Sequence, residues 1–226
     1  MSSKRFPERI KDAVRSIIFG AEDGIVSTWG LVVGVSAATH DSSLVILAGL
    51  AAAIPGAFSM AAGDYLGSKS KRELQERGVR DARAHISRRK KSILARLHKQ
   101  YRAEGFTDRE VTPWLRRLSM NKTLLLRKYE EEYGLVPESF DNPLLNAFVM
   151  FSFFILGALI PLFPFFLFSV SLAPFVSFGS AVLGLFAVGS LKTRITGRSW
   201  WRSGLEMLIV GFTAALVGYL IGLLFA

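Results

Sequence analysis

Residues 142–191 read NPLLNAFVMFSFFILGALIPLFPFFLFSVSLAPFVSFGSAVLGLFAVGSL and contain no Lys, Arg, Asp or Glu. A bilayer core about 30 Å thick needs roughly 20 apolar residues per helix, so this stretch is long enough for two membrane crossings. Pro164, Ser169, Ser171 and Pro174 predict the break between the two helices. The stretch predicts a helical membrane protein.

Three further segments of the chain can cross a membrane. Residues 42–63 and residues 207–226 carry no charge, and residues 16–40 are interrupted only by Glu22 and Asp23. The fold class predicted is therefore an all-α membrane protein with five transmembrane helices. The sequence has no cysteine, which excludes disulfides and thiolate metal sites. The N-terminus lacks the pattern of a cleaved signal peptide, so we expect the first span to be retained.

The basic residues predict the orientation of the five helices. Residues 1–15 hold five Lys and Arg, residues 65–141 hold nineteen and residues 192–202 hold four, which together are all 28. With five crossings, every basic segment falls on one side of the membrane, and basic loops favour the cytosolic side. We therefore expect the N-terminus and the central insert to be cytosolic and the C-terminus to be outside or luminal.

The chain divides into three segments by composition. Residues 1–66 hold the N-terminal segment and helices 1 and 2, residues 67–141 form a basic insert, and residues 142–226 hold helices 3 to 5. The insert carries 19 basic and 11 acidic residues. Apolar residues at helical spacing from Ile93 to Tyr101 indicate a helix. Gly105 and the segment 107–110 (TDRE) indicate a helix end followed by a capping box.

Ionisable residues within spans are costly and are therefore candidate functional residues. Asp23 lies about 12 Å along the first span, Asp64 ends the second, and Met60 precedes Asp64 by one turn on the same helix face. Glu22 and Glu206 are secondary candidates. Asp23 and Asp64 fall in the same cytosolic half, where two carboxylates and a thioether would suit a divalent first-row metal ion.

Each candidate also has a structural interpretation. Asp64 could pair with a neighbouring lysine at the membrane interface, Met60 could be ordinary helix packing, and Glu206 could be an interfacial ion-pair partner. Glu22 could face lipid headgroups or Arg15. The glycines of the first two spans, Gly24, Gly30, Gly34, Gly56 and Gly63, are interpreted as close helix–helix contacts.

Four motifs resemble those of a known family. The segments EDGIVST at 22–28, SMAAGDY at 59–65, GALIPL at 157–162 and SGLEML at 203–208 are similar, in this order, to motifs of the vacuolar iron transporter family, also called the CCC1-like family. The resemblance covers all five spans.

The resemblance implies a homodimer of five-helix subunits that moves Fe2+, and in some members Mn2+, out of the cytosol in exchange for protons. It implies that Asp23 and Met60 lie along the path of the ion, with Asp64 as the matching acidic position. The metal ion is the substrate, so no cofactor is expected. Glu132 matches one ligand position of the family's cytosolic domain.

The insert departs from the family pattern. Residues 87–99 read SRRKKSILARLHK, with basic residues where the family has metal-binding glutamates. Ammonium and guanidinium groups repel a divalent cation and offer it no lone pair. The alternative function is therefore a non-transporting or differently selective membrane protein whose insert binds anionic lipid or an acidic partner.

The sequence shows no recognisable nucleic-acid reader motif, so we expect no nucleic-acid partner. It shows neither a zinc-protease helix motif nor paired catalytic groups in the spans, so we expect no enzyme. The short termini favour a prokaryotic plasma membrane, with a vacuole-type membrane as the alternative.

Overall fold

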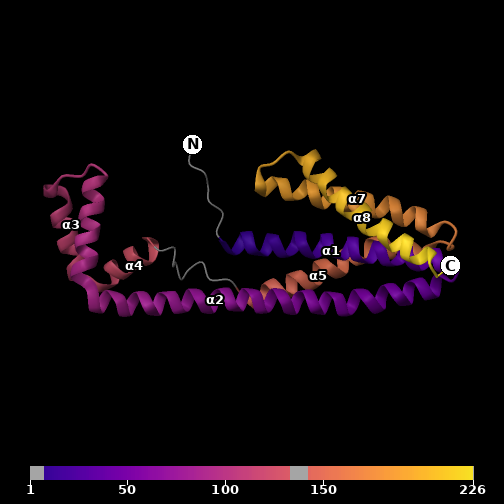
Figure 1. The fold of residues 1–226 in the computed structure, drawn as a ribbon, viewed down its shortest axis with the longest axis horizontal. Helices are drawn as coiled ribbons and strands as arrows, with labels where there is room; N and C mark the ends of the chain where they lie inside the picture. The colour runs from indigo at the N-terminus through magenta and orange to yellow at the C-terminus, as the bar shows by residue number, and fades with distance from the viewer. Residues whose placement is uncertain (1–7, 133–141, 226) are drawn as a thin grey trace. The chain divides into compact units, whose positions relative to one another are not determined.

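The computed structural model describes residues 8–132 and 142–225, and within these ranges all regular structure is helical (Figure 1). The helices are α1 (Glu8–Ala38), α2 (Ser42–Ala103), α3 (Asp108–Met120), α4 (Lys122–Glu132), α5 (Pro143–Leu162), α6 (Pro164–Leu167), α7 (Ala173–Thr196) and α8 (Trp200–Leu223). Five of them, α1, α2, α5, α7 and α8, contain segments long and apolar enough to cross a membrane. The predicted all-α fold with five membrane-spanning helices is confirmed.

The helix boundaries around the charge-free stretch follow its turn residues. Asn142 caps α5 by accepting a hydrogen bond from the backbone N–H of Leu145 at 3.4 Å, and Pro143 occupies the first helical position. The break between the two spans holds the four-residue helix α6, and α7 begins at Ala173. The predicted interruption near Pro164 and Pro174 is confirmed.

Helix α2 extends further than the sequence indicated. It is continuous over 62 residues, from Ser42 to Ala103. The apolar pattern from Ile93 to Tyr101 therefore belongs to the continuation of the second span and not to a separate helix. No glycine with positive φ or cis peptide interrupts it, and Pro55 lies within it.

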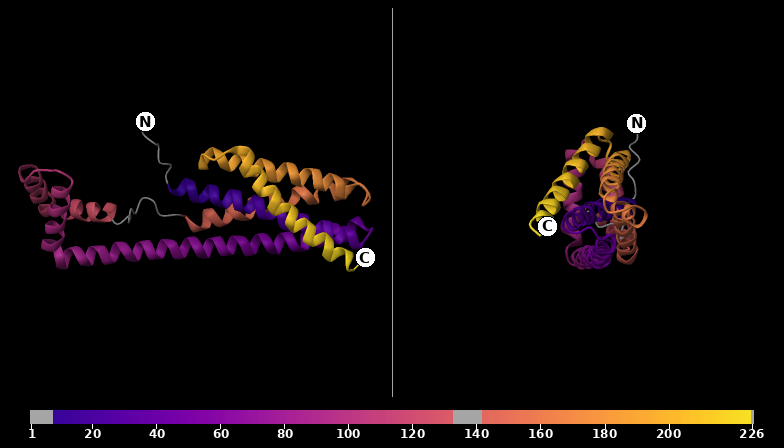
Figure 2. Two further views of the ribbon diagram at one scale, coloured as in Figure 1. Left: turned by 45° about the horizontal axis from the view of Figure 1, so that its top comes forward. Right: turned by 90° about the vertical axis from the view of Figure 1, so that its right-hand side faces the viewer.

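The described residues fall into two compact units, the first within Met1–Ser68 and Asn142–Ala226 and the second within Lys69–Asp141. In the first, α1 packs against α5, α7 and α8 (Figures 1 and 2). Trp29 of α1 meets Phe178 of α7 and Phe212 of α8 edge-on, with ring centroids 5.7 and 5.8 Å away. Many large apolar side chains of α5, α7 and α8 are exposed, as expected for helices that face lipid.

Glycines allow α1 to pack closely against the neighbouring helices α5 and α8. A Cβ added to Gly24 would collide with the carbonyl oxygen of Phe154 in α5, and one added to Gly34 would lie 2.5 Å from the carbonyl oxygen of Gly218 in α8. Gly30 and Gly56 also face neighbouring helices closely, which confirms their prediction as packing contacts. Gly63 differs, because no heavy atom of the described residues lies within 4 Å of a Cβ placed there.

The second unit has its own small core. Ile93 and Leu97 of α2 pack with Val111, Leu115 and Leu118 of α3, joined by Leu125 of α4. Gly105 turns the chain after α2 with a φ of 97°, which a glycine adopts readily. The predicted capping box is confirmed: Glu110 Oε2 accepts hydrogen bonds from the backbone N–H of Thr107 at 2.8 Å and from its hydroxyl at 2.7 Å.

Candidate cation site

A cavity of about 230 Å3 lies between α1, α2 and α5 within the first unit. The acidic side chain among its lining residues is Asp23, and Met60 supplies a thioether. The remaining lining residues are small, hydroxyl-bearing or aromatic: Ser27, Thr28, Ala52, Ala53, Gly56, Ser59 and Phe154. The structure therefore brings Asp23 and Met60 to one cavity.

Packing of α1 on α5 fixes the position of Asp23. The neighbouring residue, Gly24, touches the backbone of Phe154, and Gly157 of α5 touches the carbonyl oxygen of Ala21. Side chains at either contact would push the helices apart, so the backbone beside Asp23 is held against α5 on one side. The Asp23 side chain is half-buried.

The wall formed by α2 is made of small residues. Ala52, Ala53, Gly56 and Ser59 leave space beside Phe154, and a Cβ on Gly56 would lie 3.1 Å from the Cζ of that ring. Ser27 Oγ donates a hydrogen bond to the main-chain oxygen of Asp23 at 2.5 Å. The described residues therefore give the cavity one carboxylate, three hydroxyls and one thioether, which are oxygen and sulfur ligands suited to a first-row divalent ion.

Asp64 does not lie among the described residues that line this cavity. Its carboxylate is buried, with 3% of the side chain exposed, and it is held by two residues of α1. Ser16 Oγ donates a hydrogen bond to Asp64 Oδ2 at 2.8 Å, and Arg15 Nη2 lies 3.3 Å from Asp64 Oδ1. Asp64 is thus paired with Arg15 and hydrogen-bonded to Ser16.

The secondary candidates lie elsewhere. Glu22 interacts electrostatically with Lys192 of α7 and with Glu206 of α8. Glu206 is exposed. Glu132 is the last residue of α4, and its side chain lies outside the described residues. Throughout the described part of the chain, no three His, Cys, Asp or Glu residues gather in a group that could hold a metal ion.

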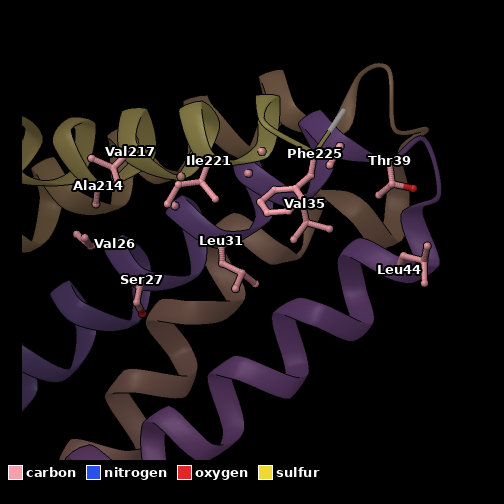
Figure 3. A pocket seen from close by; sticks show the side chains of 15 residues that line it. Val26, Ser27, Leu31, Val35, Thr39, Leu44, Ala214, Val217, Ile221 and Phe225 are labelled. Carbon is pink, nitrogen blue, oxygen red and sulfur yellow. The ribbon is translucent and has the colours of Figure 1, made fainter.

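A second hollow, an apolar groove of about 660 Å3, runs between α1 and α8 (Figure 3). Leu31 and Val35 of α1 and Val217 and Ile221 of α8 line it. Ser27 lines both the groove and the cavity that contains Asp23. The two hollows therefore share one hydroxyl-bearing residue of α1.

Sequence reasoning missed the residues that surround the two carboxylates. In the sequence, Arg15 belongs to the basic N-terminal segment and Ser16 begins the first span, yet both contact Asp64, which lies 49 and 48 residues further along the chain. Phe154 lies in a run of apolar residues with nothing to distinguish it. The hydroxyl of Ser27, one turn after Asp23, was the available signal because α-helical residues four apart share a face.

Comparison with known proteins gives a consistent family assignment. The chain is 29% identical over 210 residues to vacuolar iron transporter 1 of Oryza sativa subsp. japonica, a match that covers 92% of this chain and 83% of that protein. It is 30% identical over 212 residues to vacuolar iron transporter 1 of Arabidopsis thaliana, covering 92% and 84%. Protein CCC1 of Saccharomyces cerevisiae is 29% identical over 218 residues, covering 89% and 66%. The model of the VIT family matches residues 14–223, and the chain therefore belongs to the VIT family.

Proposed function

We propose that this multi-pass membrane protein transports a divalent transition metal ion, Fe2+ or Mn2+, out of the cytosol in exchange for protons. The observation that carries the proposal is the cavity between α1, α2 and α5, where Asp23 and Met60 meet in a chain of the VIT family. The names of the relatives in rice and Arabidopsis supply iron as the expected substrate.

The donor set supports a first-row transition metal. Carboxylate and hydroxyl oxygens alone suit Mg2+, Ca2+ or Mn2+, and a thioether adds preference for a softer ion such as Fe2+. The described residues of one chain give the cavity one carboxylate, and a second copy that faces the cavity would raise the ligand count. The proposed working form is therefore the homodimer that the resemblance implies.

The orientation and host membrane belong to the same proposal. The three basic segments are placed in the cytosol by the positive-inside tendency, which puts the N-terminus and the insert inside and the C-terminus outside or in a lumen. A prokaryotic plasma membrane stays our expectation for the host, with a vacuole-type membrane as the alternative. No catalytic step is assigned to the chain.

Metal flux into liposomes tests the transport function. The purified full chain is reconstituted in liposomes that contain a metal-sensitive dye, and Mn2+ entry is followed with the interior acidic, equal or alkaline relative to the outside. Proton exchange predicts fastest entry with the interior acidic, accompanied by a rise in interior pH. If the rate of Mn2+ entry does not depend on the pH gradient, proton coupling is ruled out. If Mn2+ enters no faster than into protein-free liposomes, the transport function is ruled out.

A second candidate function rests on the basic insert. Several of its cations are exposed, and some form exposed ion pairs with acids one turn away, such as Arg72 with Glu76 and Arg77 with Asp81. Such pairs contribute about 0–1 kcal/mol each and leave a basic surface for an anionic leaflet. The proposal is that the insert binds anionic lipid headgroups.

Vesicle binding tests the lipid proposal. The full chain in nanodiscs of neutral lipid is mixed with vesicles of neutral lipid or with vesicles containing phosphatidylserine. Binding to the anionic vesicles that weakens between low and high salt supports the proposal, because screening acts on exposed charges. Equal binding to both vesicle types contradicts it.

A further inference from the structure

The pairing of Asp64 with Arg15 has a consequence for ion entry. Asp64 follows Met60 by four residues on α2, which is about 6 Å along the helix axis, and Arg15 precedes Asp23 by eight residues on α1. In the proposed orientation, Asp64 and Arg15 each lie nearer than the cavity residues to the cytosolic end of their helix. The ion pair therefore lies on the cytosolic side of the cavity in that orientation.

The two partners differ in exposure. The Asp64 side chain is 3% exposed, whereas the Arg15 side chain is 72% exposed. A buried carboxylate needs a partner because its desolvation is costly. The exposed Arg15 guanidinium stays well solvated when it leaves the pair. The cost of its departure falls on the buried Asp64 carboxylate, which then needs another cation at Oδ1.

Asp64 has a second hydrogen-bond donor in Ser16. The Ser16 hydroxyl lies 2.8 Å from Oδ2, while the Arg15 guanidinium lies 3.3 Å from Oδ1. The longer of the two contacts is the one between Arg15 and Oδ1. A divalent cation at Oδ1 would replace one positive charge by two while the Ser16 bond holds the carboxylate in position.

We propose that Arg15 is an internal competitor for the transported cation: its guanidinium occupies the place at Asp64 Oδ1 that the arriving metal ion takes. Arg15 then acts through Asp64, as a residue that sets the apparent affinity of the cytosolic entrance for the metal ion. This inference rests on the proposed transport function, and it makes Asp64 an entrance ligand separate from the cavity of Asp23 and Met60.

The competition predicts the direction in which the Mn2+ concentration for half-saturation of uptake changes when Arg15 is replaced. Arg15→Gln removes the competing charge and keeps a polar side chain, so half-saturation of Mn2+ uptake should fall by roughly threefold or more, because one positive charge near the ion is lost. Arg15→Lys keeps the charge and should retain the wild-type value within about twofold. A purely structural role of Arg15 would lower maximal flux in Arg15→Gln and would not tighten half-saturation.

A double-mutant cycle separates action through Asp64 from a general charge effect. In an Asp64→Asn background, Arg15→Gln should leave half-saturation unchanged, since the carboxylate for which Arg15 competes is gone. The matched control is Arg72→Gln, which removes an exposed cation from the cytosolic segment of α2, where it pairs with Glu76. This control should behave as wild type.

The experiment measures Mn2+ uptake by liposomes for wild type, the two Arg15 variants, Arg72→Gln, Asp64→Asn and the double variant. Lower half-saturation in Arg15→Gln that disappears in the Asp64→Asn background supports the proposal. Unchanged or higher half-saturation in Arg15→Gln, with normal wild-type uptake, overturns the competition and leaves the transport proposal standing. An equal fall in Arg72→Gln also overturns it, and a wild type without uptake overturns both.

Discussion

Gly34 of α1 lies so close to Gly218 of α8 that a Cβ on Gly34 would be 2.5 Å from the Gly218 carbonyl oxygen. No contact of this kind exists for Gly63 of α2 among the described residues. The two glycines therefore allow a direct test of where close packing matters in this fold.

Gly34→Ala should destabilise the protein by about 1–3 kcal/mol, because the backbone of α8 has to move away from the new methyl group. Thermal unfolding in detergent measures the effect as a lower midpoint. Gly63→Ala is the control, and it should be neutral or stabilise by up to about 1 kcal/mol through helix propensity. Equal midpoints for the two variants would show that the α1–α8 contact is looser than described.

Trp29 should tolerate loss of its N–H better than loss of its ring. The residue is 1% exposed, and within the described structure its Nε1 has no hydrogen-bond partner. Trp29→Phe removes the unpaired donor and keeps an aromatic contact with Phe178 and Phe212, so we expect a cost below about 1.5 kcal/mol. Trp29→Ala should cost about 3–5 kcal/mol by leaving a cavity. The unfolding midpoints of the two variants check this order, and a similar loss in both would contradict it.

The capping box of α3 should make that helix end pH-dependent. Hydrogen bonds from the Thr107 hydroxyl and backbone N–H hold the pKa of Glu110 below its usual 4.5. A lowered folded-state pKa means that Glu110 stabilises α3 above the unfolded pKa, and that this contribution is lost as pH falls through the folded value. Amide exchange at the start of α3 should therefore be faster in Glu110→Gln than in wild type at pH 7.

At acid pH the difference in amide exchange rate between wild type and Glu110→Gln should become smaller. The two proteins are compared at the same pH each time, so that the pH dependence of intrinsic exchange cancels. The exposed Glu104, which precedes Gly105, provides the control substitution Glu104→Gln. A difference at the start of α3 that persists unchanged below the folded pKa would show that the Glu110 carboxylate charge is not its source.

The thioether of Met60 should influence which ion is carried. Met60→Leu preserves an apolar side chain of similar size and removes the sulfur, so the cavity loses its softest ligand. Because thioethers favour softer ions, the ratio of Fe2+ to Mn2+ uptake by liposomes should fall relative to wild type. Met150→Leu in α5 is the control, since Met150 is buried and lies outside the described lining of the cavity. An unchanged ratio of Fe2+ to Mn2+ uptake in Met60→Leu would show that the Met60 sulfur is not a ligand of the ion.

The spans could be predicted from the sequence because charge is excluded from them over whole helices. The break near Pro164 and the capping box at Thr107 followed from local turn and cap chemistry. The continuous α2 could not be foreseen, because a change from apolar to basic composition at residue 69 says nothing about whether the backbone hydrogen bonds stop.

The candidate site was only partly predictable for a related reason. Asp23 and Met60 stand out as rare residue types within apolar helices. The pairing of Arg15 with Asp64 depends on how α1 and α2 align in space, and residues 49 apart in sequence carry no local signal of that alignment. Likewise, the space beside Phe154 depends on the small residues of α2 facing it, a register that sequence spacing alone leaves open.

The central claim is that the cavity of Asp23 and Met60 is the path of the metal ion, and Mn2+ uptake by liposomes carrying Asp23→Asn tests it most directly. Asp41→Asn is the matched control, because Asp41 is exposed and caps the start of α2 through the Ser43 N–H at 2.8 Å, a role that asparagine fills equally well. The account predicts that Asp23→Asn lowers the initial uptake rate by about tenfold or more while the protein stays folded, and that Asp41→Asn matches wild type. Wild-type uptake by Asp23→Asn would contradict it.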